Sequence, residues 1–387
     1  MVSNWKTSNI TDLLKPNGIK IGPFGSQLKK ELFIQNGDYK VYGQENVYAQ
    51  NFKIGDRYMT RSHFDKLRSC ELLSGDFVMS TMGTVGKCAI VPKHITRGIM
   101  DSHLIRLRFD EKVIDKTYLL QLFSPDIQFL KDQTDKLSVG GIMDGLSVKI
   151  VSSLTVEYPS SVEEQKAIVN ALSAADGMIS SLEKLIANKK AIKQGVMQEL
   201  LTGKKRLPGF VGEWKKYKLD DLLKYEQPTK YIVQNTEYSE QGVPVLTAGK
   251  SLLLGYTVET EGIYENIPVI IFDDFVTSSK YINFRFKVKS SAMKMLTLKD
   301  ENMNLKLVFE LMQMINFLPV DHQRHWISQY SQFEIKMPLE IKEQSAIASI
   351  LSDMDNEIEV LEQKLAKARQ VKQGMMQQLL TGKVRLV

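Results

Sequence analysis

Several kinds of site are missing from this 387-residue sequence. It has only two cysteines, Cys70 and Cys88, which is too few for a disulfide framework and favours a reducing, cytoplasmic setting. The five histidines do not combine with these cysteines at a metal-ligand spacing. No apolar run approaches the roughly 18 residues of a membrane helix, and Met1 leads directly into polar residues rather than a signal peptide. We therefore expect no structural disulfide, metal site or membrane anchor.

Catalytic motifs are also absent. Residues 83–87 read Gly-Thr-Val-Gly-Lys, but a phosphate-binding loop needs a wider spacing between its glycines. A tight turn that exposes Thr84 and Lys87 at a strand end is the better interpretation. Asp273 and Asp274 are adjacent on a predicted strand, where neighbouring side chains point to opposite faces, so we interpret them as solvated acids rather than metal ligands. The sequence predicts a protein that is not an enzyme and holds no cofactor.

Net charge is small for a protein that binds phosphates over its whole surface. The total is +6, and residues 164–207 supply eight basic against four acidic side chains. Residues 343–386 supply six of each, so the rest of the chain has a net charge of only +2. Any contact with nucleic acid must then fall on local patches, or a partner must supply much of the affinity.

The dominant feature that is present is a duplication. Residues 164–207 and 343–386 align without a gap at an offset of 179, with 23 identities over 44 positions. Both stretches lack proline, and their apolar residues alternate at spacings of four and three, which places one narrow stripe along a helix. Each helix could reach roughly 57 Å at about 1.5 Å per residue. We expect the stripes to pair as an antiparallel coiled coil through Ile168, Leu172, Ile179, Leu182, Ile347, Leu351, Ile358 and Leu361.

Two glycines inside these helices need an explanation, since glycine in a helix costs about 1 kcal/mol. Gly195 and Gly374 occupy equivalent positions in the sequence Lys-Gln-Gly-x-Met-Gln. Either another backbone approaches closely there, or the glycines were simply inherited with the duplication. Each helix then ends in Leu-Leu-Thr-Gly-Lys, a sequence typical of a helix C-terminus.

The helices separate two globular regions that begin alike, with Trp5-Lys6 and Trp214-Lys215. Alternating strand patterns mix with helical ones in both regions, which predicts an α/β, or mixed α+β, fold with pseudo-twofold symmetry. The helical patterns cover residues 115–131 and 305–317. The expected domains are 1–160 (globular), 161–205 (helical), 206–338 (globular) and 339–387 (helical).

This layout resembles the specificity subunit of type I restriction-modification systems. The resemblance rests on Ile21–Leu28 (IGPFGSQL), Gly75–Val91, Asp101–Leu107 (DSHLIRL) and the two duplicated helices. One departure is Asp101-Ser102-His103, where glutamine is more common at the middle position. The resemblance implies that each globular region is a target-recognition domain for double-stranded DNA. It also implies that the helices hold two modification subunits, which bind S-adenosylmethionine and methylate adenine, and it leaves open whether restriction subunits join.

Two diverged domains on paired helices would read two different half-sites separated by an unread spacer. Base readout needs donors and acceptors on loops. The rival interpretation is a non-catalytic coiled-coil scaffold that binds only protein. The candidate DNA-binding residues are Ser26, Gln27, Gln44, Asn46, Ser80, Thr84, Lys87, His103, Lys230, Tyr231, Lys250, Ser278, Lys280, Arg285, Arg324 and His325.

Overall fold

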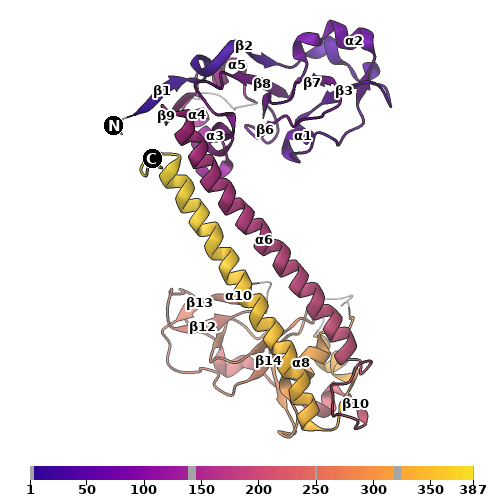
Figure 1. The fold of residues 1–387 in the computed structure, drawn as a ribbon. Helices are drawn as coiled ribbons and strands as arrows, with labels where there is room; N and C mark the ends of the chain where they lie inside the picture. The colour runs from indigo at the N-terminus through magenta and orange to yellow at the C-terminus, as the bar shows by residue number, and fades with distance from the viewer. Residues whose placement is uncertain (1–3, 138–144, 249–250, 318–323, 387) are drawn as a thin grey trace. The chain divides into compact units, whose positions relative to one another are not determined.

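The computed structural model describes residues 4–137, 145–248, 251–317 and 324–386 (Figure 1). Its contacts divide the chain into two units, which cut across the linear domains that the sequence suggests. Unit 1 combines residues 1–183 with 364–387, and unit 2 is residues 184–363. Each unit therefore contains one globular region and one end of each long helix.

The long helices are α6 (Val162–Leu200) and α10 (Ile341–Leu379), each of 39 residues. They run side by side in opposite directions within each unit (Figure 1). In unit 1, Asp176 pairs with Lys372 at 2.6 Å and Glu183 pairs with Arg369 at 2.7 Å. In unit 2, the ion pairs are Lys189–Glu357 and Lys193–Asp355. Residue numbers rise on one helix as they fall on the other, so the helix segments of each unit are antiparallel.

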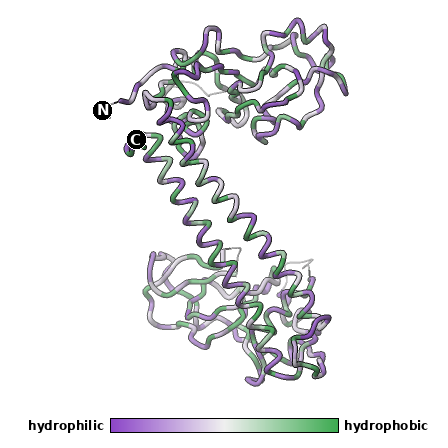
Figure 2. The backbone as a smooth tube through the Cα atoms, viewed as in Figure 1, coloured by the Kyte–Doolittle hydropathy of each residue, from purple (hydrophilic) through white to green (hydrophobic). Residues whose placement is uncertain are grey.

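The predicted apolar stripe is the less exposed side of both helices, and Figure 2 shows hydrophobic positions recurring along them. Ile168 and Leu172 are fully buried, but they join the core of the first globular region. Ile347 and Leu351 do the same in the second. These four residues therefore hold each globular region against the helices, in addition to pairing the helices with each other. Their spacing in the sequence indicated only the helix pairing. The other members of the stripe, Ile179, Leu182, Ile358 and Leu361, are buried or half-buried.

The described residues of unit 1 form three sheets. Strand β1 (Trp5–Asn9) pairs antiparallel with β9 (Thr155–Pro159). The remaining strands form a four-stranded sheet of order β2-β8-β5-β6 and a three-stranded sheet of order β4-β3-β7. Their bounds are β2 Leu14–Ile21, β3 Tyr39–Tyr42, β4 Tyr58–Met59, β5 Phe77–Ser80, β6 Cys88–Ile90, β7 Gly98–Met100 and β8 Leu104–Phe109. The short helices are α1 Gln44–Tyr48, α2 Arg61–Lys66, α3 Lys116–Leu122, α4 Phe129–Leu137 and α5 Val148–Ser152.

Unit 2 repeats this plan. Strand β10 (Trp214–Lys218) pairs with β18 (Glu334–Pro338), and the two larger sheets have the orders β11-β17-β14-β15 and β13-β12-β16. The duplication therefore extends through the globular regions, with β14 and β15 standing where β5 and β6 stand in unit 1. The bounds are β11 Leu223–Glu226, β12 Val243–Leu246, β13 Leu253–Thr257, β14 Val269–Asp273, β15 Ser279–Ile282, β16 Lys287–Val288, β17 Met293–Leu298, α7 Leu219–Leu222, α8 Leu305–Met312 and α9 His325–Ser328.

Two sequence interpretations need correction. The helical pattern over 115–131 is broken after α3 by a short 3-10 turn, η5 (Pro125–Ile127), because proline fits the first position of a turn but cannot donate inside a helix. Asp273 and Asp274 are not solvated: both are buried. The burial of these two acids shapes the loop described below.

Candidate nucleic-acid interface

Four loops of unit 1 meet at one edge, which we call the loop edge: residues 22–28, 43–48, 81–87 and 101–103. The Gly22 N–H donates to the Leu104 carbonyl, and a Cβ atom on Gly22 would lie 1.8 Å from the Asp101 carbonyl oxygen. Only glycine allows this close backbone approach. The Thr81 N–H donates to the His103 carbonyl at 2.9 Å. The three globular motifs that carry the family resemblance are therefore adjacent in space.

Charge also ties the loop edge together. Arg57 pairs with Asp101 at 3.0 Å and with Glu45 at 2.6 Å. Burial lowers the pKa of Arg57, but the two carboxylates outweigh it, so the pKa lies above its usual value. The same Asp101 carboxylate accepts the His103 N–H at 3.0 Å. His103 is thus held by its backbone while its ring stays partly exposed.

The loop between β5 and β6 is a tight turn that exposes Thr84, as the sequence suggested. Gly83 and Gly86 both adopt positive φ, at 65° and 78°. The hydroxyl of Ser80 donates to the Thr84 carbonyl and accepts from the Lys87 N–H. Tyr48 braces the turn from α1, donating to one loop carbonyl and accepting the Thr84 N–H. The loop is therefore fixed rather than loosely attached.

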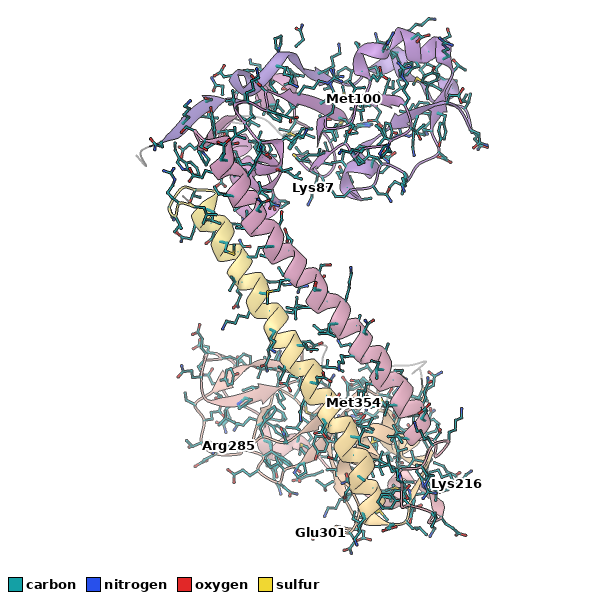
Figure 3. The ribbon with its side chains drawn as sticks, viewed as in Figure 1. Lys87, Met100, Lys216, Arg285, Glu301 and Met354 are labelled. Atoms are coloured by element: carbon teal, nitrogen blue, oxygen red, sulfur yellow. The ribbon has the colours of Figure 1, made fainter. Side chains whose placement is uncertain are left out.

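The structure separates the unit 1 candidates into two groups. Asn46 and Ser80 are fully buried and use their polar groups on loop backbone, so they shape the edge and do not remain DNA-contact candidates. The side chain of Ser26 lies outside the described residues. The candidates that stay accessible at the loop edge are Gln27, Gln44, Thr84, Lys87 and His103, of which Lys87 is labelled in Figure 3.

The equivalent loop of unit 2, between β14 and β15, is held by the two buried acids. Asp273 Oδ1 accepts the N–H groups of Phe275 and Val276 at 2.9 and 3.1 Å. Asp274 forms a 3.0 Å ion pair with buried Lys294. Its carboxylate also accepts a hydrogen bond from the backbone N–H of Trp326. An unpaired buried charge would be costly here, so the ion pair fixes the base of the loop against β17, and the hydrogen bond to Trp326 fixes it against α9.

The unit 2 candidates fall around two places. Ser278, Lys280 and Arg324 are exposed near the end of β14. Lys230, Tyr231 and Arg285 lie near the β16 strand, with the Tyr231 hydroxyl donating to Glu226; Arg285 is labelled in Figure 3. His325 is buried at 2% exposure, and its N–H donates to the Asp274 carbonyl, so it does not remain a DNA-contact candidate either. Lys250 lies outside the described residues.

A second feature, at the helix ends, was missed by the sequence reasoning. Arg206, just after α6, makes two hydrogen bonds of 2.6 and 2.7 Å to Glu343 at the start of α10. Arg385, just after α10, makes the matching pair of bonds to Glu164 at the start of α6, and this raises the pKa of Arg385. We call each arginine–glutamate pair a helix-end clamp. The two glutamates occupy equivalent positions in the duplicated stretches, and so do the two arginines. This repetition was the sequence signal that could have revealed the clamps.

The glutamine that follows each clamp glutamate docks a globular region. Gln165 donates to the Pro159 carbonyl at 2.8 Å and accepts the Asp115 N–H at 2.6 Å. Gln344 donates to the Pro338 carbonyl at 2.8 Å and accepts the Asn304 N–H at 2.9 Å. The same dipeptide, Glu-Gln, therefore joins helix and globular region in both units.

Other kinds of site find no support in the described part of the chain. Across residues 4–137, 145–248, 251–317 and 324–386, no group of three or more His, Cys, Asp or Glu side chains could hold a metal ion. Within those same ranges, no helix is long and apolar enough to cross a membrane. Both free cysteines are buried, and burial raises the pKa of the Cys88 thiol, which makes it a poor nucleophile.

Comparison with known proteins agrees with this architecture. The EcoR124I/EcoR124II specificity subunit of Escherichia coli is 49% identical over 148 residues, which span 37% of this chain and 36% of that protein. The MjaVIII specificity subunit of Methanocaldococcus jannaschii is 26% identical over 326 residues, covering 75% of each protein. A crystal structure of the specificity subunit from M. genitalium shares the fold, with a TM-score of 0.62, 14% identity and coverage of 97% of this chain and 96% of that one.

The sequence also matches the type I restriction modification DNA specificity domain family twice, over residues 2–194 and 212–370. Each match takes in one globular region and most of the long helix that follows it. Two copies of one domain explain why the two units share their strand orders. The chain therefore belongs to the type I restriction-modification specificity family and carries two DNA specificity domains.

Proposed function

We propose that each globular region reads one half of an asymmetric bipartite DNA target, and that the chain itself performs no chemistry. The observation that carries this proposal is the equivalence of the β5–β6 and β14–β15 loops. They follow the same strand in each unit, both are fixed by hydrogen bonds, and their sequences differ. Equivalent frames with different exposed side chains suit two readers of different half-sites.

Methylation-aware sequencing of host DNA tests this function. We expect one two-part motif carrying N6-methyladenine when the chain is present, and its loss when the gene is deleted. A control strain with a catalytically inactive modification subunit should lose the same motif. If no motif depends on the chain while the modification subunit is expressed, the scaffold interpretation replaces ours.

We further propose that helix length sets the unread spacer between the half-sites. Deleting residues 181–187 and 360–366 removes one equivalent heptad from α6 and from α10, which keeps each apolar stripe in phase. Each helix shortens by about 10 Å, so the spacer should shorten by about three base pairs. Sequencing the methylation motif of this variant measures the change. A motif with the original spacer would contradict the proposal.

The outer side of the helices supplies the docking sites for two modification subunits in this proposal. Ile192 on α6 and Val371 on α10 are equivalent residues, and they are 53% and 52% exposed. Gly195 and Gly374 follow three residues later, and apart from their chain neighbours and the adjacent backbone of their own helix, no described atom lies within 4 Å of a Cβ placed there. The close approach that the sequence suggested therefore does not come from the described part of this chain. An exposed apolar residue beside an open glycine fits a partner backbone.

The partners would supply what this chain lacks. The modification subunits would bind S-adenosylmethionine and transfer its methyl group to adenine. The contribution of this chain is to hold DNA and partners together in a fixed register. Because the two docking positions are equivalent, two such subunits should bind, one in each unit.

A further inference from the structure

Both equivalent loops expose an apolar side chain within three residues of the end of the preceding strand, where solvent would favour polar residues; we call each of these residues the apolar tip of its loop. Met82 in the β5–β6 loop is 44% exposed, and Val276 in the β14–β15 loop is 59% exposed. Phe275 beside Val276 is also exposed. The feature occurs in the loop between the same pair of strands in two units whose loop sequences and lengths differ. Scattered exposed hydrophobic residues are normal, but repetition in equivalent loops points to a shared use.

Hydrogen bonds fix the backbone at both tips. A surface residue without a function would not require such fixation. The Met82 carbonyl accepts the Tyr48 hydroxyl at 2.9 Å. The Val276 N–H is bound by Asp273, and Thr277 next to it has φ of +57°. A left-handed conformation is unfavourable for a β-branched residue, by about 1–3 kcal/mol, and persists only where the surroundings impose it. Unit 2 therefore keeps a strained turn that presents Val276.

The neighbours of each tip are those of a DNA-reading loop. Thr84 is exposed beside Met82, and Lys87 closes the same turn. Ser278 and Lys280 are exposed just after Val276. Lysines neutralise phosphates, hydroxyl groups reach base edges, and an apolar side chain can contact the thymine methyl group or lie against a base step. A purely protein-binding tip would not require this mixture.

We propose that Met82 and Val276 make the apolar base contacts of the two half-sites, one in each. This rests on the proposed function and assigns the residues that contribute to its specificity. Each residue contributes at its own half-site only, because the two lie in different DNA specificity domains. Valine has no hydrogen-bonding group and the methionine sulfur is only a weak acceptor, so neither side chain can read a base edge by hydrogen bonding.

The experiment measures DNA binding by the assembled complex with its modification subunits. The variants are Val276→Ser, which removes both methyl groups, and Met82→Gln, which keeps side-chain length and replaces the thioether by an amide. We expect each to weaken binding of the cognate duplex about five- to tenfold and to leave binding of a scrambled duplex unchanged. Val258→Ser and Leu73→Gln, at other exposed apolar positions of the same units, serve as matched controls and should change neither binding affinity.

Modified DNA then identifies the group that each tip touches. Uracil in place of a thymine removes only the methyl group, so it should weaken binding by the wild-type complex and have no further effect on the Val276→Ser variant. An increase in 2-aminopurine fluorescence that needs Val276 would instead show insertion between bases; either result supports the proposal. Wild-type affinity for cognate DNA in both variants overturns it, as does loss of a protein partner with DNA binding intact. If the wild-type complex itself shows no preference for cognate DNA, the proposed function fails rather than this assignment.

Discussion

Replacing Arg206 by alanine should destabilise unit 2 by about 3 kcal/mol. Glu343, its partner in the helix-end clamp, is 1% exposed, so the variant leaves a carboxylate buried without its counter-charge. Removing one partner of a buried pair costs about 3–5 kcal/mol, and we expect the lower end because the Arg206 side chain is itself 28% exposed. Urea unfolding followed by circular dichroism measures the change as a shift in midpoint.

Three variants separate the clamp from general effects of lost charge. Lys205→Ala removes a neighbouring, exposed lysine whose ion pair with Glu199 spans 3.6 Å, and it should change stability by less than about 0.5 kcal/mol. Arg206→Lys keeps the charge but loses the paired hydrogen bonds, so its loss of stability should lie between those of Arg206→Ala and Lys205→Ala. Glu343→Gln in the Arg206→Ala background removes the buried charge and should recover part of the loss. Equal stabilities for Arg206→Ala and Lys205→Ala would contradict the role of the clamp.

Arg385 and Glu164 form the second clamp, in unit 1, with the same geometry. Loss of Arg385 should therefore act in the same direction. The two clamps sit in different units, so their effects should be additive. Deviation from additivity in the double variant would show that the two clamps are energetically coupled.

The duplication made most of the architecture predictable. Two gapless copies with apolar residues spaced alternately by four and three predicted α6 and α10. Because the copies are equivalent, an antiparallel pair is the arrangement in which a pseudo-twofold axis relates them. The apolar stretch that leads into Asp273 was recognised as a strand, and it is β14. Pro125 was a local signal that the helical prediction over residues 115–131 passed over. Local signals failed where tertiary contacts decide: Asp274 is buried because its partner Lys294 lies on another strand, β17.

The site residues were harder to predict for the same reason. Asn46, Ser80 and His325 are polar residues in loops, and nothing local distinguishes a buried loop brace from an exposed base reader. Met82 and Val276 were not among the candidates because these were chosen as hydrogen-bond donors and acceptors on loops, which apolar side chains do not provide. Their exposure follows from the turn geometry, which Asp273 sets locally for Val276 and which Tyr48 sets for Met82 from a distant part of the chain.

The docking glycines should respond to side-chain size in a way that no effect on the chain itself can reproduce. Alanine or leucine at Gly195 should stabilise α6 by up to about 1 kcal/mol, because both are better helix formers and the space beside the glycine is open. If a modification subunit packs its backbone there, Gly195→Ala should weaken docking modestly. Gly195→Leu should weaken it more than about 100-fold, since a large side chain separates the two backbones.

The equivalent site in unit 1 turns this into a count of bound partners. Native mass spectrometry of the wild-type complex should show two modification subunits, Gly195→Leu should show one, and Gly195→Leu combined with Gly374→Leu should show none. The midpoint temperature of thermal unfolding of the isolated variants should be no lower than that of the wild type, which excludes misfolding as the cause of lost partner binding. Two partners bound to the double variant would place the docking surface elsewhere and would leave the glycines as an inheritance of the duplication.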